Sequence, residues 1–482
     1  MSSKVYKPAQ IAMPDIPPPI PNVRNSMRSS LTLKLVIIGI LTGGLLILTI
    51  PLFVVINDRE VRRDEVVEEI SSKWGRDQTV FGPILTVPYH HTIVNRSSNG
   101  RSSTTKKTQF LHFLPDTLEI NASVVPEMKY RGIFETVVYK STLKIRGSFR
   151  NLDWDLARVE ETEILKERAS LCIGIPDVRG IREATTITFQ GKQLDAQPGL
   201  PTQEVLSSGV SSKVNLTETN GTLAFEIDLH LDGSSSLAFS PLGKTTSVNM
   251  ESPWISPSFD GAFLPLDKNI GNDGFSASWK VLHLNRSIPH AWTGPAPSSG
   301  GGANWKNGQL FAGPANILRD FAFGVKFYMP NDVYQKTTRM AKYAILFLVF
   351  GFTSFFFTEI LQKAQVHPIQ YLLVGFAILV FYLLLLSLSE HFGFDRAYLA
   401  STAAVVFLIG SYASAILSSQ KLAISVSAVL SILYGYLYVI LQLESYALLM
   451  GSLGLFGALA LAMFFTRKID WYSLRLPSGD SK

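Results

Sequence analysis

Apolar residues are concentrated in one run near the N-terminus and in a block of runs after residue 340. The first run covers residues 35–56, and the others cover residues 341–361, 369–389, 397–417, 422–442 and 446–466. A helix needs roughly 20 apolar residues to cross a bilayer core about 30 Å thick. The pattern therefore predicts six transmembrane helices. The first, at 35–56, is an uncleaved anchor, and the other five form a bundle at 341–466.

The stretch between these runs, residues 57–340, alternates between apolar and polar positions. The alternation is clearest at Leu223–Leu231, Val137–Phe149 and Ala277–Val281. Successive side chains of a strand point to opposite faces, so period two is typical of a half-buried strand. Glycine- and proline-rich turns separate the segments, which predicts a large, mostly antiparallel, sandwich-like β-rich domain. The charged segment Asp58–Ser71 has helical spacing, and we expect it to extend the first helix.

Basic residues indicate the orientation of the predicted helices. They are frequent in the tails, residues 1–34 and 467–482, and in two short loops at Lys363 and Lys421. The acidic residues Glu390, Asp395 and Glu444 fall in the alternate loops. The positive-inside rule then predicts cytoplasmic N- and C-termini and an extracytoplasmic domain at 57–340. Trp471 and Tyr472, just after the last run, are expected as interfacial anchors.

Composition supports this topology. Charged residues make up 17% of the chain, against roughly 25% in ordinary soluble domains. The net charge of +6 is explained by the basic cytoplasmic segments, so we expect no nucleic-acid partner. The single cysteine, Cys172, excludes an internal disulfide, and we interpret it as a small buried apolar residue.

Three polar or proline-rich segments are predicted to be irregular. Asn95–Lys107 is serine-rich and indicates a hairpin loop or a flexible excursion. Pro295–Gly302 is rich in Pro, Ser and Gly and is interpreted in the same way. The proline-rich segment Pro14–Pro21, in the cytoplasmic tail, is expected to be extended.

The sequence contains no convincing catalytic motif. Gly243-Lys244-Thr245 resembles the end of a phosphate-binding loop, but Ala238 stands where that motif needs glycine, so a turn is favoured. The adjacent His90 and His91 would point to opposite faces of a strand, which disfavours a zinc site. We therefore predict a protein without enzymatic activity or cofactor. An exterior hydrolase is an alternative that rests only on the size of the domain.

Four ionisable residues near the ends of the predicted helices are candidate functional residues. They are Glu359, His367, Glu390 and His391. Ionisable groups within membranes are costly and often mark pathways for ions or solutes. These four lie near the interfaces, which favours solvated helix ends and loop contacts. Serines within the runs, such as Ser389 and Ser411, are interpreted as helix-packing residues.

Several short motifs are similar to a known family. In the last third of the chain they are His367–Gly375, Phe381–Leu386, Ser389–His391, Leu441–Glu444, Tyr446–Leu449 and Arg467–Tyr472, with Tyr334–Lys336, Arg339 and Lys342–Leu346 before them. In the exterior domain they are Gly82-Pro83, Val87-Pro88, His112–Pro115, Arg131–Phe134, Asp177 with Arg179–Ile181, Ser252–Trp254, Pro257–Phe259, Gly261 and Phe263–Pro265. Together they resemble the inner-membrane protein CreD family from about the first helix to Tyr472.

The resemblance implies a bacterial inner-membrane protein linked to cell-envelope integrity. It also implies regulation by a two-component system and altered sensitivity to colicins or β-lactams. The family has no assigned reaction, so no catalytic residue is carried over. Asp177 and Arg179 are charged residues among these motifs. We expect them to form either an ion pair or a binding point on the exterior domain.

The leading hypothesis is thus a non-enzymatic envelope-integrity protein. Its expected partners are the lipid bilayer and periplasmic or inner-membrane proteins, and the sequence indicates no oligomeric state. The alternative is a transporter or lipid-handling protein that uses helices two to six.

Overall fold

The computed structural model divides the chain into two compact units. One comprises Met1–Asp58 with Val333–Lys482, and the other comprises Arg59–Asp332. The residues described are 31–96, 102–217, 221–295, 305–306, 309–310, 316–327, 329, 333–362, 366–416, 419–443 and 446–467. The expectations for Pro14–Pro21, Glu444, Trp471 and Tyr472, and for Pro295–Gly302 beyond its first residue, lie outside these ranges.

The first unit is helical. Its helices are α2 (Leu31–Ile47), the first part of α3 (Thr49–Trp74), α5 (Val333–Lys342), α6 (Ala344–Gln362), α7 (Pro368–Phe392), α8 (Phe394–Ile416), α9 (Gln420–Gln442) and α10 (Ala447–Thr466). Among the described residues, four helices are long and apolar enough to cross a membrane, and a fifth span is formed if the bent pair α5–α6 is counted as one. The helix α10 contains a shorter apolar stretch, Ala447–Leu461. The chain is therefore a membrane protein by composition and helix length.

The predicted run at 341–361 corresponds to α6, with its first two residues in the preceding helix α5. It begins inside α5, and a bend of 46° separates α5 from α6. α5 is amphipathic, with Tyr334, Thr337, Met340 and Ala341 buried between polar residues. Because a search for continuous apolar runs passes over such a helix, α5 could not be predicted from the hydropathy pattern.

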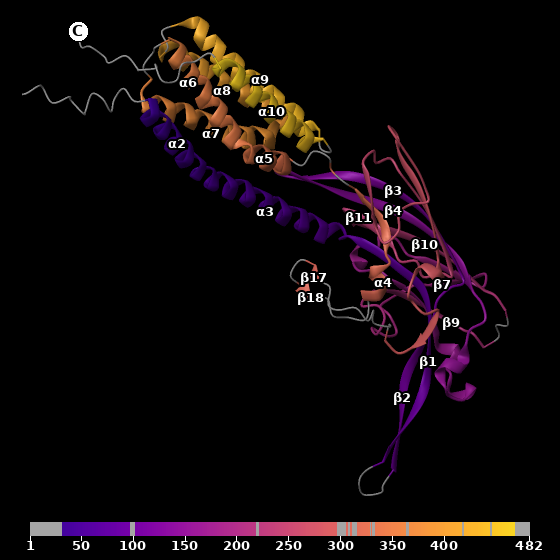
Figure 1. The fold of residues 1–482 in the computed structure, drawn as a ribbon. Coiled ribbons are helices and arrows are strands. Elements are labelled where there is room, and N and C mark those ends of the chain that lie inside the picture. The colour runs from indigo at the N-terminus through magenta and orange to yellow at the C-terminus, as the bar shows by residue number, and fades with distance from the viewer. Residues whose placement is uncertain are drawn as a thin grey trace, which may run out of the picture. The chain divides into compact units, whose positions relative to one another are not determined.

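The second unit contains two large sheets (Figure 1). The nine-stranded sheet has the order β13-β19-β11-β1-β5-β9-β8, with β2 paired to β1 and to β16. The eight-stranded sheet has the order β14-β15-β12-β3-β4-β10-β6-β7. The strands are β1 (Gln78–Arg96), β2 (Ser102–Phe113), β3 (Thr117–Arg131), β4 (Phe134–Phe149), β5 (Ala169–Gly174), β6 (Thr186–Phe189), β7 (Lys192–Asp195), β8 (Gln197–Pro198), β9 (Gly209–Val214), β10 (Leu223–Ser234), β11 (Ser236–Phe239), β12 (Thr245–Ser252), β13 (Pro257–Gly261), β14 (Asp267–Gly271), β15 (Gly274–Leu282), β16 (Ala291–Thr293) and β19 (Phe323–Phe327). A separate pair is formed by β17 (Trp305–Lys306) and β18 (Gln309–Leu310), and a short helix, α4 (Asn316–Asp320), precedes β19.

The strands predicted from alternation are present. β4 pairs antiparallel with β3 and with β10, and β15 pairs antiparallel with β12 and with β14. Parallel pairing occurs between β1 and β11 and between β3 and β12. Both sheets contribute to one buried core, in which Leu143, Ile145 and Phe149 of β4 are fully buried. Each such side chain contributes about 1.5–3 kcal/mol through burial.

The serine-rich segment at residues 95–107 is mostly part of a hairpin. Antiparallel pairing of β1 with β2 continues to Asn95 opposite Ser103 and Arg96 opposite Ser102. The strands thus extend further into this segment than predicted. Cys172, on β5, is buried as predicted and is not disulfide-bonded.

Candidate functional site

The end of α3 is held by aromatic and cationic contacts within the second unit. The indole nitrogen of Trp74 donates to the carbonyl of Tyr139 at 3.3 Å. The Lys129 ammonium lies 4.8 Å from the centre of the Trp74 ring, and the Arg182 guanidinium carbon lies 5.1 Å from it. Cations at this distance from an indole ring are attracted by its electron-rich face. Trp74 therefore anchors the helix terminus to the β domain.

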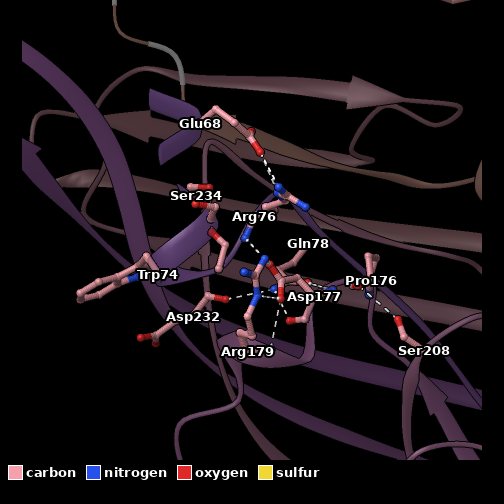
Figure 2. A network of polar contacts seen from close by, with 12 residues as sticks. Glu68, Trp74, Arg76, Gln78, Pro176, Asp177, Arg179, Ser208, Asp232 and Ser234 are labelled. Atoms are coloured by element: carbon pink, nitrogen blue, oxygen red, sulfur yellow. Dashed lines mark hydrogen bonds and ion pairs between the residues drawn. The ribbon is translucent and has the colours of Figure 1, made fainter. Parts of the chain in front are cut away.

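Asp177 and Arg179, both predicted candidates, form an ion pair beside this anchor (Figure 2). Arg179 donates to Asp177 through Nε at 2.8 Å and through Nη2 at 2.7 Å. The backbone amides of Arg179 and Arg76 also donate to the carboxylate, at 3.2 and 3.3 Å. These donors stabilise the charged carboxylate, with Arg179 contributing most, and they lower the pKa of Asp177. Asp177 thereby fixes the backbone just after α3 to a short 3-10 turn at Val178–Gly180.

Gln78, at the start of β1, connects the backbone of Asp177 to the backbone of a second aspartate, Asp232. Its amide nitrogen donates to the carbonyl of Asp177 at 2.9 Å and to that of Asp232 at 3.3 Å. The Asp232 side chain accepts from Arg182 Nε at 2.8 Å, and Arg182 Nη2 donates to the carbonyl of Trp74 at 3.2 Å. The hydrogen-bond network thus reaches Trp74, the last residue of α3. We call Trp74, Arg76, Gln78, Asp177, Arg179, Arg182 and Asp232 the α3 clamp.

Two glycines permit the close approach of the backbone in the clamp. A Cβ atom on Gly180 would lie 2.2 Å from the carbonyl oxygen of Asp232, and one on Gly75 would lie 2.7 Å from it. Gly75 also has φ of +148°, a conformation that side chains disfavour. Gly75 and Gly180 thus lie where their two chain segments both approach the carbonyl oxygen of Asp232.

A second polar cluster lies in the helical unit, around Glu359 of α6. Its carboxylate is 1% exposed and pairs with Lys34 of α2. It also accepts from the Val366 amide at 3.0 Å and from the Tyr371 hydroxyl at 2.9 Å. Lys34 donates in addition to the carbonyl of Val366 at 2.9 Å. A buried carboxylate is stable only when it is paired and hydrogen-bonded, and these contacts meet that requirement.

His367 begins α7 close to this cluster in sequence. Its Nδ1 accepts from the Ile369 amide at 3.3 Å, and its own amide donates to the Gln370 side chain at 2.9 Å. Pro368 follows at the first helical position, where a missing N–H costs no hydrogen bond. His367 therefore acts as a helix cap in this structure.

The other two predicted residues lie at the opposite end of α7. Glu390 accepts from the Tyr334 hydroxyl of α5 at 3.1 Å. His391 is exposed. Glu390 follows Tyr371 by 19 positions, so about 28 Å of helix separates them. The structure thus does not bring the four membrane candidates into one site.

Sequence reasoning missed most partners of these residues. Lys34 was interpreted only as part of a basic tail, although a lysine directly before an apolar run can also pair inside the bundle. Tyr371 was noted only as part of a family motif. Trp74, Gln78 and Asp232 carried no sequence signal, because they meet only after the sheets form.

A small cavity also lies in the core of the β-rich unit. A cavity of about 10 Å³ is lined by Thr86, His112 and Cys172 among apolar residues. His112 is buried and its Nδ1 lies 3.1 Å from the Thr86 hydroxyl. Burial lowers the pKa of His112 to about 4 and raises the pKa of the Cys172 thiol to about 12. Both groups are therefore uncharged at neutral pH, which disfavours a thiolate nucleophile. Among the described residues, no group of three or more His, Cys, Asp or Glu side chains is arranged to hold a metal ion.

Comparison with known proteins adds the family. The structure of native yeast LTA4 hydrolase is 10% identical and covers 39% of this chain and 30% of that one, with a TM-score of 0.17, which is too low to support any argument. The inner membrane protein CreD of Escherichia coli (strain K12) is 31% identical over 447 residues, covering 91% of this chain and 93% of that protein. The family model described as inner membrane protein CreD matches residues 30–472. The chain therefore belongs to the CreD family of inner membrane proteins.

Proposed function

We propose that this protein is a non-enzymatic cell-envelope integrity protein whose exterior domain contacts envelope components and is coupled to the membrane through α3. One observation carries the proposal. α3 is a single helix from Thr49 to Trp74, so it begins in the helical unit and ends at the α3 clamp in the β-rich unit. Within the β-rich unit the end of α3 is fixed by charged hydrogen bonds, each stabilising by about 1.5–3 kcal/mol.

The topology that we propose has six transmembrane helices. The first is the apolar part of α2–α3, the second combines α5 with α6, and α7 to α10 supply the others. Both termini are cytoplasmic, and residues 57–340 form a periplasmic β-sandwich. The charge asymmetry of the loops supports this orientation.

The cellular role that we propose follows from the family. We expect expression of the protein to be controlled by a two-component system. We also expect the protein to alter the tolerance of the cell to colicins or β-lactams. The chemistry of the exterior domain supports a contact role, because large apolar side chains are exposed on it. Tyr130 is 68% exposed, Leu264 76% and Leu284 81%.

In-cell photo-crosslinking tests the contact role. A benzophenone amino acid is placed at Tyr130, Leu264 or Leu284, with Lys192 on β7 as an exposed polar control. We expect light-dependent adducts with identified envelope proteins or lipids at one or more of the apolar positions and not at Lys192. Absence of adducts at all three positions would contradict the proposal.

A second function, transport or lipid handling by the bundle, is favoured by the buried Glu359 cluster. Charged groups held inside a membrane unit often belong to ion-coupled pathways. Purified protein in liposomes would be tested against a panel of lipids and solutes, with a Glu359→Gln, Glu390→Gln, His391→Ala triple variant as the comparison. Movement by the wild type and not by the variant supports transport, and no movement by either removes this candidate.

A further inference from the structure

Four buried hydroxyl groups in the described part of the helical bundle have no hydrogen-bond partner within the protein. They belong to Tyr382 of α7, Ser401 and Thr402 of α8, and Tyr434 of α9. Tyr382, Ser401 and Tyr434 are completely buried. A hydroxyl that loses its hydrogen bonds on burial is destabilising, and lipid tails cannot replace them. The presence of such unpaired hydroxyl groups on three helices therefore needs an explanation.

The two tyrosines belong to one aromatic cluster. The ring centroid of Tyr434 lies 4.4 Å from that of Phe347 and 4.7 Å from that of Phe381. Tyr382 contacts the same two rings, at 6.2 and 5.2 Å. The Tyr398 hydroxyl donates to the carbonyl of Tyr434 at 2.7 Å, so it is satisfied and closes the cluster on the α8 side.

Ser401 and Thr402 lie at the same level of the bundle. α8 and α9 are antiparallel neighbours, and the rings of Tyr398 and Tyr438 lie 5.1 Å apart. In antiparallel helices, a residue three or four positions after Tyr398 on α8 is level with a residue three or four positions before Tyr438 on α9. Ser401 and Thr402 are therefore level with Tyr434, one helical turn from the Tyr398–Tyr438 contact.

Charge and space restrict what these hydroxyls can bind. Residues 371–389 of α7, 397–416 of α8 and 422–442 of α9 contain no Asp, Glu, Lys, Arg or His. A bound ion would thus have no countercharge on these segments, and an isolated charge is costly in this medium. The rings also pack at ordinary aromatic distances, which excludes a large ligand between them.

We propose that Tyr382, Tyr434, Ser401 and Thr402 form a buried site for an uncharged, water-sized ligand, which is water itself. A buried water typically makes about three hydrogen bonds to groups that lack protein partners, and hydroxyls can serve it as donors or acceptors. The site lies inside the bundle, 11 residues after Tyr371 and eight before Glu390 along α7. This corresponds to about 16 Å and 12 Å of helix. The inference does not rest on the proposed envelope function.

The sign of a stability change tests the site. If a hydroxyl is bonded to water, Tyr→Phe removes hydrogen bonds and lowers the melting temperature. If the hydroxyl is unpaired, the same change removes an unsatisfied group and is neutral or stabilising. We expect Tyr382→Phe and Tyr434→Phe each to lower Tm by about 2–4 °C in detergent. Tyr398→Phe, which loses a defined bond, is the positive control, and Tyr446→Phe, which is exposed at the start of α10, is the neutral control.

An unchanged or raised Tm in both Tyr382→Phe and Tyr434→Phe would overturn the proposal. Ser401→Ala provides a variant of smaller volume change if a tyrosine variant fails to insert, and it is expected to lower Tm in the same way. Hydroxyl-radical footprinting of the wild-type protein gives an independent result. Radicals formed from bound water should oxidise Tyr382 and Tyr434, and labelling of Tyr446 without either of them would also reject the site.

Discussion

At the residue scale, Glu359 and Lys34 provide an asymmetric test of the buried ion pair. Lys34→Met leaves the buried Glu359 carboxylate without its cation, and breaking such a pair costs about 3–5 kcal/mol. Glu359→Gln is expected to cost less, because the Lys34 side chain is 15% exposed and can reach solvent. Thermal unfolding in detergent should therefore give the lowest Tm for Lys34→Met.

The double variant distinguishes pairing from packing. Lys34→Met with Glu359→Gln should be more stable than Lys34→Met alone, since no unpaired charge is left. Lys421→Met, an exposed lysine at the start of α9, is the matched control and should leave Tm unchanged. Equal, additive losses in the two single variants would show that the ion pair is energetically unimportant.

The buried His112 predicts a pH dependence of stability in the β-rich unit. Its pKa is lowered from 6.5 to about 4 by burial, so the unfolded chain binds the proton more tightly. The stabilisation is present above pH 6.5 and is lost as pH falls toward 4. Between pH 7 and pH 5 the loss is about 2 kcal/mol.

Urea unfolding followed by tryptophan fluorescence at these two pH values measures this effect. His112→Gln should reduce the pH dependence by that amount, whereas His283→Gln, on an exposed side chain, should not. If His112→Gln keeps the wild-type pH dependence, His112 is not the group that titrates.

At the scale of elements, the α3 clamp is expected to control the local stability of the end of α3. Asp177→Asn weakens the bonds from Arg179, and Asp232→Asn weakens the bond from Arg182. Hydrogen bonds to charged groups stabilise by about 1.5–3 kcal/mol, so amide exchange in residues 59–74 should become roughly tenfold faster or more.

Hydrogen–deuterium exchange with mass spectrometry measures this change. Lys73→Gln, which breaks an exposed pair with Glu69, is the control and should have little effect. Unchanged protection of residues 59–74 in the Asp177 and Asp232 variants would mean that Trp74 alone holds the helix.

How well each element could be predicted depends on the range of its signal. α7, α8 and α9 agree with the predicted runs to within a few residues, because apolar length is a local property. α5 was missed, because its buried face is only visible once Tyr334 and Thr337 have neighbours. Strand order was not predictable, since the parallel pairing of β3 with β12 joins segments far apart in sequence.

The candidate site shows the same limit. Asp177 and Arg179 were identified as a pair because they are charged residues within one of the motifs of the family resemblance. Their connection through Gln78 to Asp232 spans three separate regions of sequence. Tyr382 and Tyr434 gave no signal for a polar site, because a tyrosine in an apolar run is usually a packing residue.

At the scale of the whole molecule, α3 is the element that the two units share. Residues up to Asp58 belong to the helical unit, and residues from Arg59 onward belong to the β-rich unit. We propose that α3, which continues across this boundary, transmits force or rotation, which a flexible linker would not do. The proposed function therefore requires that a contact made by the β-rich unit is coupled to the membrane through α3.

The most direct test replaces Arg59–Glu65 of α3 at constant length. One variant carries a helix-forming Ala/Glu/Lys sequence, and the other carries a flexible Gly/Ser sequence. Each is expressed at matched membrane abundance in a strain that lacks the gene, and survival in detergent and β-lactam is measured. We expect the wild type and the helical variant to restore survival and the flexible variant not to restore it. Equal rescue by the flexible variant would contradict coupling through α3, and no rescue by the wild type would contradict the envelope function itself.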